Sequence, residues 1–510
     1  MSSDHTSPLE PRSTESPSAF GAMSEEFFAV VSPTPVADPS LLKLNASLAK
    51  SLDLSPEWLR SPAGVETLAG NRALPGDEPL AMAYAGHQFG NWVPRLGDGR
   101  AIQIGEALDA QGQTHGIQLK GSGPTPFSRN GDGRAAIGPV LREYVLSEAM
   151  FALGIPTTRA LAMVTTGEPV YRERAEPGAI LTRVASGFVR VGTFQYFAAQ
   201  GRTDSIQKLA DHVIERRYAD LSLEFDAGPA RYRALLSRVV AVQAELIAKW
   251  MGVGFIHGVM NTDNMSIMGE TIDYGPCAFL DEYDPTKVFS SIDQNGRYAY
   301  QQQPGIGLWN LTRFAETLIP LLDEEEDAGV EIAKSQLDGY AELFHAAYGD
   351  GLRQKMGFRN WDQAGQEISS AFLDAMAQGK ADFTLAFRRL SELSAGVDGD
   401  DDGAEKALRS LFAEPAAIDA FLPLWRARLR EEGLEDGPRK AAMRAVNPLF
   451  IPRNHRVQEA IDALVDREDS SPLNALLAVT ALPFEENEDH AAYANQPGPD
   501  EIVRRTFCGT

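Results

Sequence analysis

The chain has 510 residues, and 47 Lys and Arg against 71 Asp and Glu give it a formal net charge of −24. Hydrophobic residues make up 43% and charged residues 23%, which is typical of a globular protein and excludes disorder throughout. Such an acidic chain is expected to repel nucleic acid and anionic membranes, because both are bound through clustered cations. The length predicts roughly three domain-sized units.

The search for targeting signals and the number of cysteines restrict the class of protein further. No stretch reaches the ~18–20 apolar residues that a membrane helix needs, and no signal or transit peptide is evident at the start. The only cysteines are Cys277 and Cys508, which excludes a disulfide scaffold and a cysteine-based zinc site. We expect a cytoplasmic, bacterial protein with neither nucleic-acid nor membrane partners.

The first elements in chain order are a tail and a small sheet. Residues 1–20 are rich in Ser, Thr and Pro and predict a disordered tail. The segment 39–60 predicts a helix, since its leucines fall on one stripe. From residue 80 glycines crowd the chain, and short alternating runs at 101–104 and 116–120 predict strands of a small sheet over 80–125.

Helices dominate the rest of the chain. The run 140–153 after Pro139 is apolar nearly all round, which predicts a buried helix, and 229–252 predicts an amphipathic one. Residues 305–480 are mostly helical in pattern, interrupted by acidic runs at 323–327 and 398–405 that we interpret as solvated loops. The layout predicts an α+β, two-lobed nucleotide-binding enzyme with its ligand between the lobes.

One segment resembles the catalytic loop of protein kinases. His257 and Asn264 have the spacing of the first and last residues in H-R-D-x-x-x-x-N, and Asp273-Tyr274-Gly275 follows like D-F-G. Strand-like residues at 266–268 and 271–272 predict a hairpin that brings Asn264 and Asp273 together. Their side-chain oxygens are the hard ligands that Mg²⁺ on a polyphosphate prefers.

One position departs from the kinase pattern. Val259 stands where a kinase has its catalytic Asp, and a valine can neither accept a proton nor orient a hydroxyl. Asp263 is the nearest carboxylate. Either phosphoryl transfer is lost, or Asp263 acts as a base from another place. The alternative is a hairpin whose Asn and Asp serve backbone turns alone.

Cations upstream support a phosphate site. Lys120 ends a predicted strand, like the kinase lysine that pairs with a helix glutamate, and Glu143 and Glu148 are both candidate partners. Arg183 and Arg190 stand in apolar surroundings, where arginine needs either an anionic ligand or a structural salt bridge. Two glycine turns, 95–100 and 130–134, are either plain loops or phosphate-binding backbone.

Longer motifs resemble the selenoprotein O family, called SelO or YdiU in bacteria. They are Ala83-Tyr84-Ala85-Gly86-His87-Gln88-Phe89-Gly90, Gln118-Leu119-Lys120-Gly121-Ser122-Gly123, Asn130-Gly131-Asp132-Gly133-Arg134, Val259-Met260-Asn261-Thr262-Asp263-Asn264-Met265-Ser266 and Thr271-Ile272-Asp273-Tyr274-Gly275-Pro276. The similarity is dense over 80–310. It implies a protein-kinase-like two-lobed fold, with a small Gly-rich β lobe and a large helical lobe with extensions.

The resemblance also implies an activity. Members transfer AMP from ATP to Ser, Thr or Tyr hydroxyls of proteins, with ATP flipped relative to kinases and pyrophosphate released. UMP transfer from UTP, favoured by Mn²⁺, is attributed to bacterial members. We therefore expect Mg²⁺ or Mn²⁺ as cofactor, ATP or UTP as co-substrate, and protein partners that include the chain itself.

The site residues that the resemblance implies are all present. Asp263 matches the proton acceptor, Glu143 rather than Glu148 matches the partner of Lys120, and Asn264 and Asp273 match the metal ligands. The positions that match nucleotide contacts are Gly97, Gly99, Arg100, Lys120, Asp132, Gly133, Arg183, Arg190 and Asp273. A kinase-type phosphotransferase and a non-catalytic nucleotide-binding regulator remain as alternative functions.

We expect five segments: the tail 1–20, an N-terminal extension 21–79, the N-lobe 80–190, a helical C-lobe with additions 191–480, and a C-terminal tail 481–510. That tail carries Cys508, and Cys277 lies four residues beyond Asp273. We hypothesise a redox bridge between them that clamps the active-site segment. The alternative is two unrelated thiols.

Overall fold

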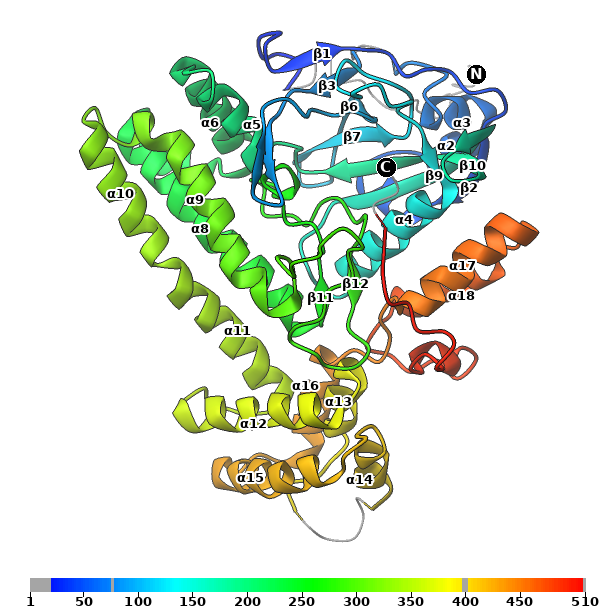
Figure 1. The fold of residues 1–510 in the computed structure, drawn as a ribbon, viewed down its shortest axis with the longest axis vertical. Helices are drawn as coiled ribbons and strands as arrows, with labels where there is room; N and C mark the ends of the chain where they lie inside the picture. Colours follow the sequence, from blue (N-terminus) through cyan, green and yellow to red (C-terminus); the bar gives the residue numbers. More distant parts are fainter. Residues whose placement is uncertain (1–19, 75–77, 397–401, 508–510) are drawn as a thin grey trace, which may run out of the picture.

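An antiparallel sheet forms one end of the computed structural model, and long helices extend from it to the other end (Figure 1). The structure describes residues 20–74, 78–396 and 402–507. The predicted α+β class is confirmed.

Within the described residues, the main sheet has eight strands. Their spatial order is β1 Phe28–Val30, β3 Leu80–Met82, β6 Ala101–Leu108, β7 Thr114–Lys120, β10 Ala175–Ala185, β9 Arg159–Tyr171 and β2 Ser40–Leu44, with β8 Ala135–Ala136 paired to β10. The strands predicted at 101–104 and 116–120 are confirmed as parts of β6 and β7. The segment 21–79, expected as an extension, supplies the strands β1 and β2 at the two edges of this sheet.

The two faces of the sheet bury different layers. On one face, Ile117 and Leu119 of β7 pack with the N-terminal helices α1 Ala46–Ser51, α2 Pro56–Arg60 and α3 Pro62–Leu68. On the other face lies α4 Ile137–Ala152, packed against Leu181 of β10. Because side chains alternate along a strand, Gln118 and Lys120 point toward the α4 face. Arg183 of β10 lies directly opposite Gln118 and shares that face.

The buried helix predicted after Pro139 is confirmed as α4, which begins two residues before that proline. It is covered on its outer side by α17 Asn454–Arg467 and α18 Ser471–Thr480, and the three helices share one apolar cluster with the sheet (Figure 1). This sandwich explains why α4 is apolar nearly all round: both of its sides are buried.

The helical end is organised around the predicted amphipathic helix, which is α8 Pro229–Gly252. It packs against α9 Gln303–Leu322, α10 Glu326–Asp338 and α11 Tyr340–Met356. The remaining helices are α5 Val191–Ala198, α6 Thr203–Arg217, α7 Asp220–Glu224, α12 Gln363–Gly379, α13 Phe383–Leu390, α14 Asp402–Arg409, α15 Ala416–Glu432 and α16 Asp436–Val446.

Three secondary-structure predictions are wrong in part. Residues 40–44 form strand β2 instead of a helix, and Pro56 starts a separate helix with Ser55 as its cap, so 39–60 is split. Residues 266–268 and 271–272 form no paired hairpin, because Ser266 and Thr271 bridge to Arg190 and Thr157 instead. Glu326 and Asp327 open α10, where carboxylates favour the helix dipole.

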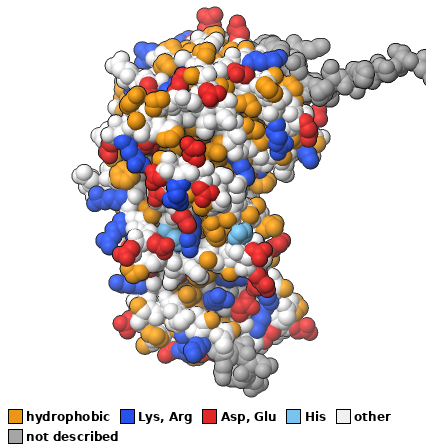
Figure 2. All heavy atoms as spheres, turned by 90° about the vertical axis from the view of Figure 1, so that its right-hand side faces the viewer, with side chains coloured by type: hydrophobic (Ala, Val, Ile, Leu, Met, Phe, Trp, Pro, Cys, Tyr) orange, Lys and Arg blue, Asp and Glu red, His pale blue; other side chains and the backbone are white. Residues whose placement is uncertain are grey.

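Some predictions fall beyond the described residues. The tail 1–20 lies outside them except for Phe20, which is buried. The acidic run 398–405 is described only from its helical part, in α14. Across the described ranges, no helix is long and apolar enough to cross a membrane. On the face drawn in Figure 2, basic and acidic side chains are interspersed.

The burial of Lys355 in α11 leads to a prediction about the stability of the protein. It is 5% exposed, its ammonium lies 4.3 Å from the Phe387 ring centre, and no carboxylate among the described residues forms an ion pair with it. Burial lowers the pKa of Lys355 to about 7. Because the unfolded chain binds this proton up to about pH 10.4, the stability of the wild type should rise between pH 7 and 10 relative to Lys355→Met.

We expect Lys355→Met to raise the free energy of unfolding at pH 7 by about 2 kcal/mol, less than the full pKa shift implies because the Phe387 ring favours the charged amine. Urea unfolding at pH 7 and pH 9.5 measures this difference, which should shrink at the higher pH. An equal difference in the free energy of unfolding at pH 7 and pH 9.5 would contradict this prediction.

Candidate functional site

A cleft of about 430 Å³ lies where the sheet meets the helical part. It is lined by side chains from β7, β10, the two glycine turns and the short helix η1 Thr262–Asn264. Among the lining residues are Gly97, Gly99, Arg100, Lys120, Asp132, Gly133, Arg183, Arg190, Asp263, Asn264 and Asp273, which the sequence had marked. Of the predicted nucleotide, metal and base positions, none is placed elsewhere. Glu143 adjoins this cleft in a smaller pocket that also contacts Lys120.

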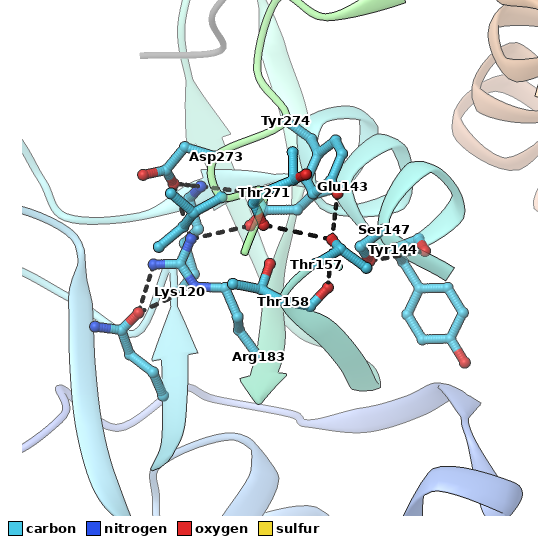
Figure 3. A network of polar contacts seen from close by, with 12 residues as sticks. Lys120, Glu143, Tyr144, Ser147, Thr157, Thr158, Arg183, Thr271, Asp273 and Tyr274 are labelled. Atoms are coloured by element: carbon cyan, nitrogen blue, oxygen red, sulfur yellow. Dashed lines mark hydrogen bonds and ion pairs between the residues drawn. The ribbon is translucent and has the colours of Figure 1, made fainter. Parts of the chain in front are cut away.

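Lys120 is the link between the sheet and α4. Its Nζ lies 2.6 Å from Glu143 Oε2 and 2.8 Å from Asp273 Oδ1, as Figure 3 shows. Glu148 points elsewhere: its carboxylate accepts hydrogen bonds from Arg159 at 2.9 and 2.7 Å. The structure therefore places Glu143, not Glu148, beside the lysine.

Two arginines complete the cation cluster around Asp273. Arg183 Nη1 donates to Asp273 Oδ1 at 2.8 Å and to Glu143 Oε1 at 3.2 Å. Arg190 Nη1 donates to Asp273 Oδ2 at 2.7 Å and to the backbone oxygen of Asp263 at 2.8 Å. Both arginines are buried, with exposed fractions of 1% and 3%. Such burial is tolerated only because each guanidinium is paired.

Asp273 is held ionised by this arrangement. Burial acts against its charge, but Lys120, Arg190 and Arg183 together hold the pKa of Asp273 well below its usual range. Its backbone has φ of +65°, a left-handed conformation that Asp tolerates better than most residues. The residue after it, Tyr274, is hydrogen-bonded to Thr157, which extends the network toward β9 (Figure 3).

Asp263 lies in a different environment. It is 6% exposed, its Oδ2 accepts a hydrogen bond from Gln88 Nε2 at 3.1 Å, and its Oδ1 is buried without a hydrogen-bond partner among the described residues. Burial raises the pKa of Asp263 to about 6, although Gln88 and Arg190 act in the opposite direction. Asp263 lines the cleft, and a carboxylate with a raised pKa in such a position can accept a proton from a bound hydroxyl.

The space beside Asp263 depends on glycine. A Cβ on Gly86 would lie 2.7 Å from Asp263 Oδ1, and one on Gly192 would lie 2.1 Å from the backbone oxygen of Ala85. Any side chain at either position would displace the carboxylate or the segment that holds it.

Asn264 and Asp273 are suited to a divalent cation. Asn264 Nδ2 donates to the backbone oxygen of Val259 at 3.0 Å, so Oδ1 is the atom of the amide that remains for a cation. Among the described residues, no group of three His, Cys, Asp or Glu side chains could hold a metal ion alone. The amide oxygen of Asn264 and the carboxylate of Asp273 are oxygen ligands of the kind that Mg²⁺ takes, usually one or two side chains together with substrate phosphates and water.

The two glycine turns form the outer wall of the cleft. Gly97 has φ of +77°, and a Cβ there would lie 2.3 Å from the Phe127 ring, so only glycine fits beneath that ring. Gly133 is equally confined, because a Cβ there would lie 2.0 Å from the backbone oxygen of Gly123. Asp132 is paired with Arg172 at 2.8 Å, so an arginine that the sequence did not mark enters the cleft here.

Three further residues of the site were missed from the sequence. Gln118 accepts from Arg183 Nε at 3.1 Å, Asp98 lies 3.6 Å from Arg190, and Gln88 donates to Asp263. Asp98 and Gln88 lie inside motifs that the sequence singled out, and Gln118 shares its strand face with Lys120. That shared face was the available signal.

The structure describes one of the two cysteines. Cys277 is buried, and its Sγ donates to the backbone oxygen of Tyr274 at 3.3 Å. Cys508 lies outside the described residues. Thr506, two residues earlier, donates to the backbone oxygen of Pro276, so the chain reaches the neighbour of Cys277. The redox bridge stays a prediction.

Comparison with known proteins adds independent findings. Residues 13–481 match the family model described as Protein adenylyltransferase SelO. A protein of Rhodopseudomonas palustris named Protein nucleotidyltransferase YdiU is 57% identical over 492 residues, which cover 96% of this chain and 98% of the relative. A Bradyrhizobium protein of the same name is 56% identical over 493 residues, with the same coverage.

The buried pairing of Glu143 generates a prediction on stability. Glu143→Gln removes one of the carboxylates that face Lys120 and Arg183, so we expect the free energy of unfolding to fall by about 3 kcal/mol. Urea unfolding measures the loss. Asp466→Asn, at an exposed position of α17, is the control and should change little. An unchanged stability of Glu143→Gln would contradict the role of this pair.

Proposed function

Because the chain belongs to the SelO family, we propose that it is a protein nucleotidyltransferase that transfers AMP from ATP to Ser, Thr or Tyr hydroxyls of proteins and releases pyrophosphate. UMP transfer from UTP is the alternative donor reaction within the same proposal. The family description and the names of the relatives support nucleotidyl transfer in general. The cleft and its charges support the more specific reaction.

The proposed fold is a two-lobed, kinase-like arrangement. Its small lobe is the antiparallel sheet with α4, and its large lobe is the helical part around α8. The ion pair between Lys120 and Glu143, and the close approach of Asp273, correspond to the lysine, helix glutamate and D-F-G aspartate of kinases. These contacts support the analogy.

The proposed nucleotide lies in the cleft with its β- and γ-phosphates inward. Lys120, Arg183 and Arg190 provide positive charge at the inner end. Gly97 and Gly99 bring the backbone close to the outer end, where Arg100 and Arg172 add two more cations. This orientation would leave the α-phosphate nearest to Asp263.

Asn264 and Asp273 are the residues that would hold Mg²⁺ or Mn²⁺. A bound divalent cation would supply charge neutralisation at the phosphates. The protein would supply the rest: Lys120, Arg183 and Arg190 would stabilise the negative charge of the departing pyrophosphate.

Asp263 is the proposed general base. Its carboxylate would accept the proton of the acceptor hydroxyl as that oxygen bonds to the α-phosphorus and the bond from this phosphorus to pyrophosphate breaks. The single observation that carries the proposal is the buried carboxylate of Asp263, which forms no ion pair with a described residue and lines the same cleft as Lys120, Arg183 and Arg190. Val259 lines the same cleft and can accept no proton, which argues against a phosphotransferase of the usual kinase type.

Labelled ATP tests the reaction class. With ATP labelled at the α-phosphate we expect label on protein, and with ATP labelled at the γ-phosphate we expect label only in released pyrophosphate. Gel autoradiography of the protein alone and with added protein acceptors measures both. Protein-bound γ-label would instead indicate a phosphotransferase, and the absence of bound label from both would indicate a non-catalytic regulator.

Variants test the assigned roles. Asp263→Asn keeps the shape of the side chain but removes the base, so transfer of α-label should fall by at least about 10²-fold. Asp273→Asn should abolish transfer, because it removes both a proposed metal ligand and the partner of three cations. Asp466→Asn is the matched control and should be as active as the wild type. Full activity of Asp263→Asn in a folded protein would refute the proposed base.

A further inference from the structure

A surface beside Asp263 combines aromatic rings with a cation. The hairpin of β4 Gly86–Gln88 and β5 Asn91–Val93 is fixed to the segment that carries Asp263. The backbone N–H of His87 donates to Thr262 Oγ1 at 2.7 Å, and that of Phe89 donates to Asn261 Oδ1 at 3.0 Å. Whatever binds along this hairpin is therefore held in fixed register with the proposed base.

The outer side of the hairpin forms a row of stacked groups. Ring centres are 5.0 Å apart between Trp92 and His87, and 5.3 Å between His87 and Trp309 of α9. The guanidinium of Arg297 lies 4.7 Å from the Trp309 ring. We call these four residues the aromatic ledge. Trp92 is 39% exposed and the other three are partly exposed.

Arg297, unlike Arg183 and Arg190 of the cleft, forms no ion pair with a described carboxylate. Its Nε and Nη2 are buried without a hydrogen-bond partner, and no carboxylate in the described ranges forms an ion pair with it. The nearby Asp293 is occupied by the backbone N–H groups of Arg297 and Tyr298, at 3.0 and 2.8 Å. The Tyr298 hydroxyl, which is neutral, accepts a hydrogen bond from Arg297 and donates one to Asn261 Oδ1 at 2.6 Å.

Acidic residues outnumber Lys and Arg by 71 to 47, so a guanidinium without a carboxylate is not explained by a shortage of acids. Arg313 on the other side of Trp309, for comparison, pairs with Glu316 at 2.6 Å. A partly exposed guanidinium that forms no ion pair with a described residue is suited to a carboxylate from outside.

We propose that the aromatic ledge binds the segment of the protein substrate that flanks the acceptor hydroxyl, and that Arg297 selects segments with Asp or Glu close to that hydroxyl. This rests on the proposed function, because it places the acceptor at Asp263. Trp and Arg are the residues that most often anchor protein interfaces, and the row of rings offers flat area at little cost in conformational entropy.

Binding is tested first without chemistry. Two fluorescent tyrosine peptides that differ only in Glu or Lys at the flanking positions are titrated with the full chain, and anisotropy gives each Kd. We expect the Glu peptide to bind about tenfold tighter. Arg297→Gln should abolish this preference, Arg297→Glu should reverse it, and Arg297→Lys should retain part of it. Arg467→Gln, exposed on α17, is the control.

Transfer of α-label to the same peptides is the second readout. Arg297→Gln should raise the KM of the Glu peptide and leave kcat and ATP affinity nearly unchanged. Because an Arg297 variant can misfold, Trp92→Ala serves as a second variant at the exposed end of the ledge, and it should weaken both peptides.

The outcomes separate the two proposals. Equal affinity for both peptides, or a preference that survives in Arg297→Glu, would overturn the ledge. Transfer of α-label that does not depend on Arg297 would overturn the proposal for the aromatic ledge but would be consistent with the proposed function. The wild type could instead bind the Glu peptide more tightly through Arg297 and yet transfer no α-label. This result would support the proposal for the aromatic ledge and refute the proposed function.

Discussion

The buried carboxylate of Asp273 is the contact on which the arrangement of the cleft depends. It binds Lys120 from β7, Arg183 from β10 and Arg190 from the segment before α5, so it joins two strands of the sheet to the helical part. Glu143 and Asp98 supply two more negative charges, and the cluster is balanced at three cations against three carboxylates. Charges this deep are costly unless paired, so each partner constrains the position of the others.

The sequence was sufficient to predict those parts of this cluster that follow from the alternation of side chains along a strand. A lysine at the end of a predicted strand and an arginine in another apolar run could be expected on the strand face that meets a buried helix. The residue pattern alone was not sufficient for the choice between Glu143 and Glu148, which only the family resemblance made. That choice depends on the rotation of α4, which is set by its packing against α17 and α18. The residues that support the arginines, Gln118 and Asp98, are visible only once β7 and β10 are in register.

The wrong predictions have a common physical cause, which is pairing between segments distant in sequence. Residues 40–44 read as a helix because their leucines continue a helical stripe, but the exposed edge of β9 provides hydrogen-bond partners that make them a strand. Ser266 and Thr271 read as two strands of a hairpin, yet each bridges to a residue far away in the chain. Short apolar runs are ambiguous in isolation, and the tertiary partner decides.

Two carboxylates ten residues apart acquire different roles from their surroundings. Asp273 is contacted by three cations, which keep its carboxylate ionised. The carboxylate of Asp263 accepts a hydrogen bond from Gln88 and forms no ion pair with a described residue, while Arg190 contacts its backbone oxygen. The same arginine thus stabilises one carboxylate and leaves the other able to take a proton. A net charge of −24 obscures this, because the cations that matter are few, buried and individually paired.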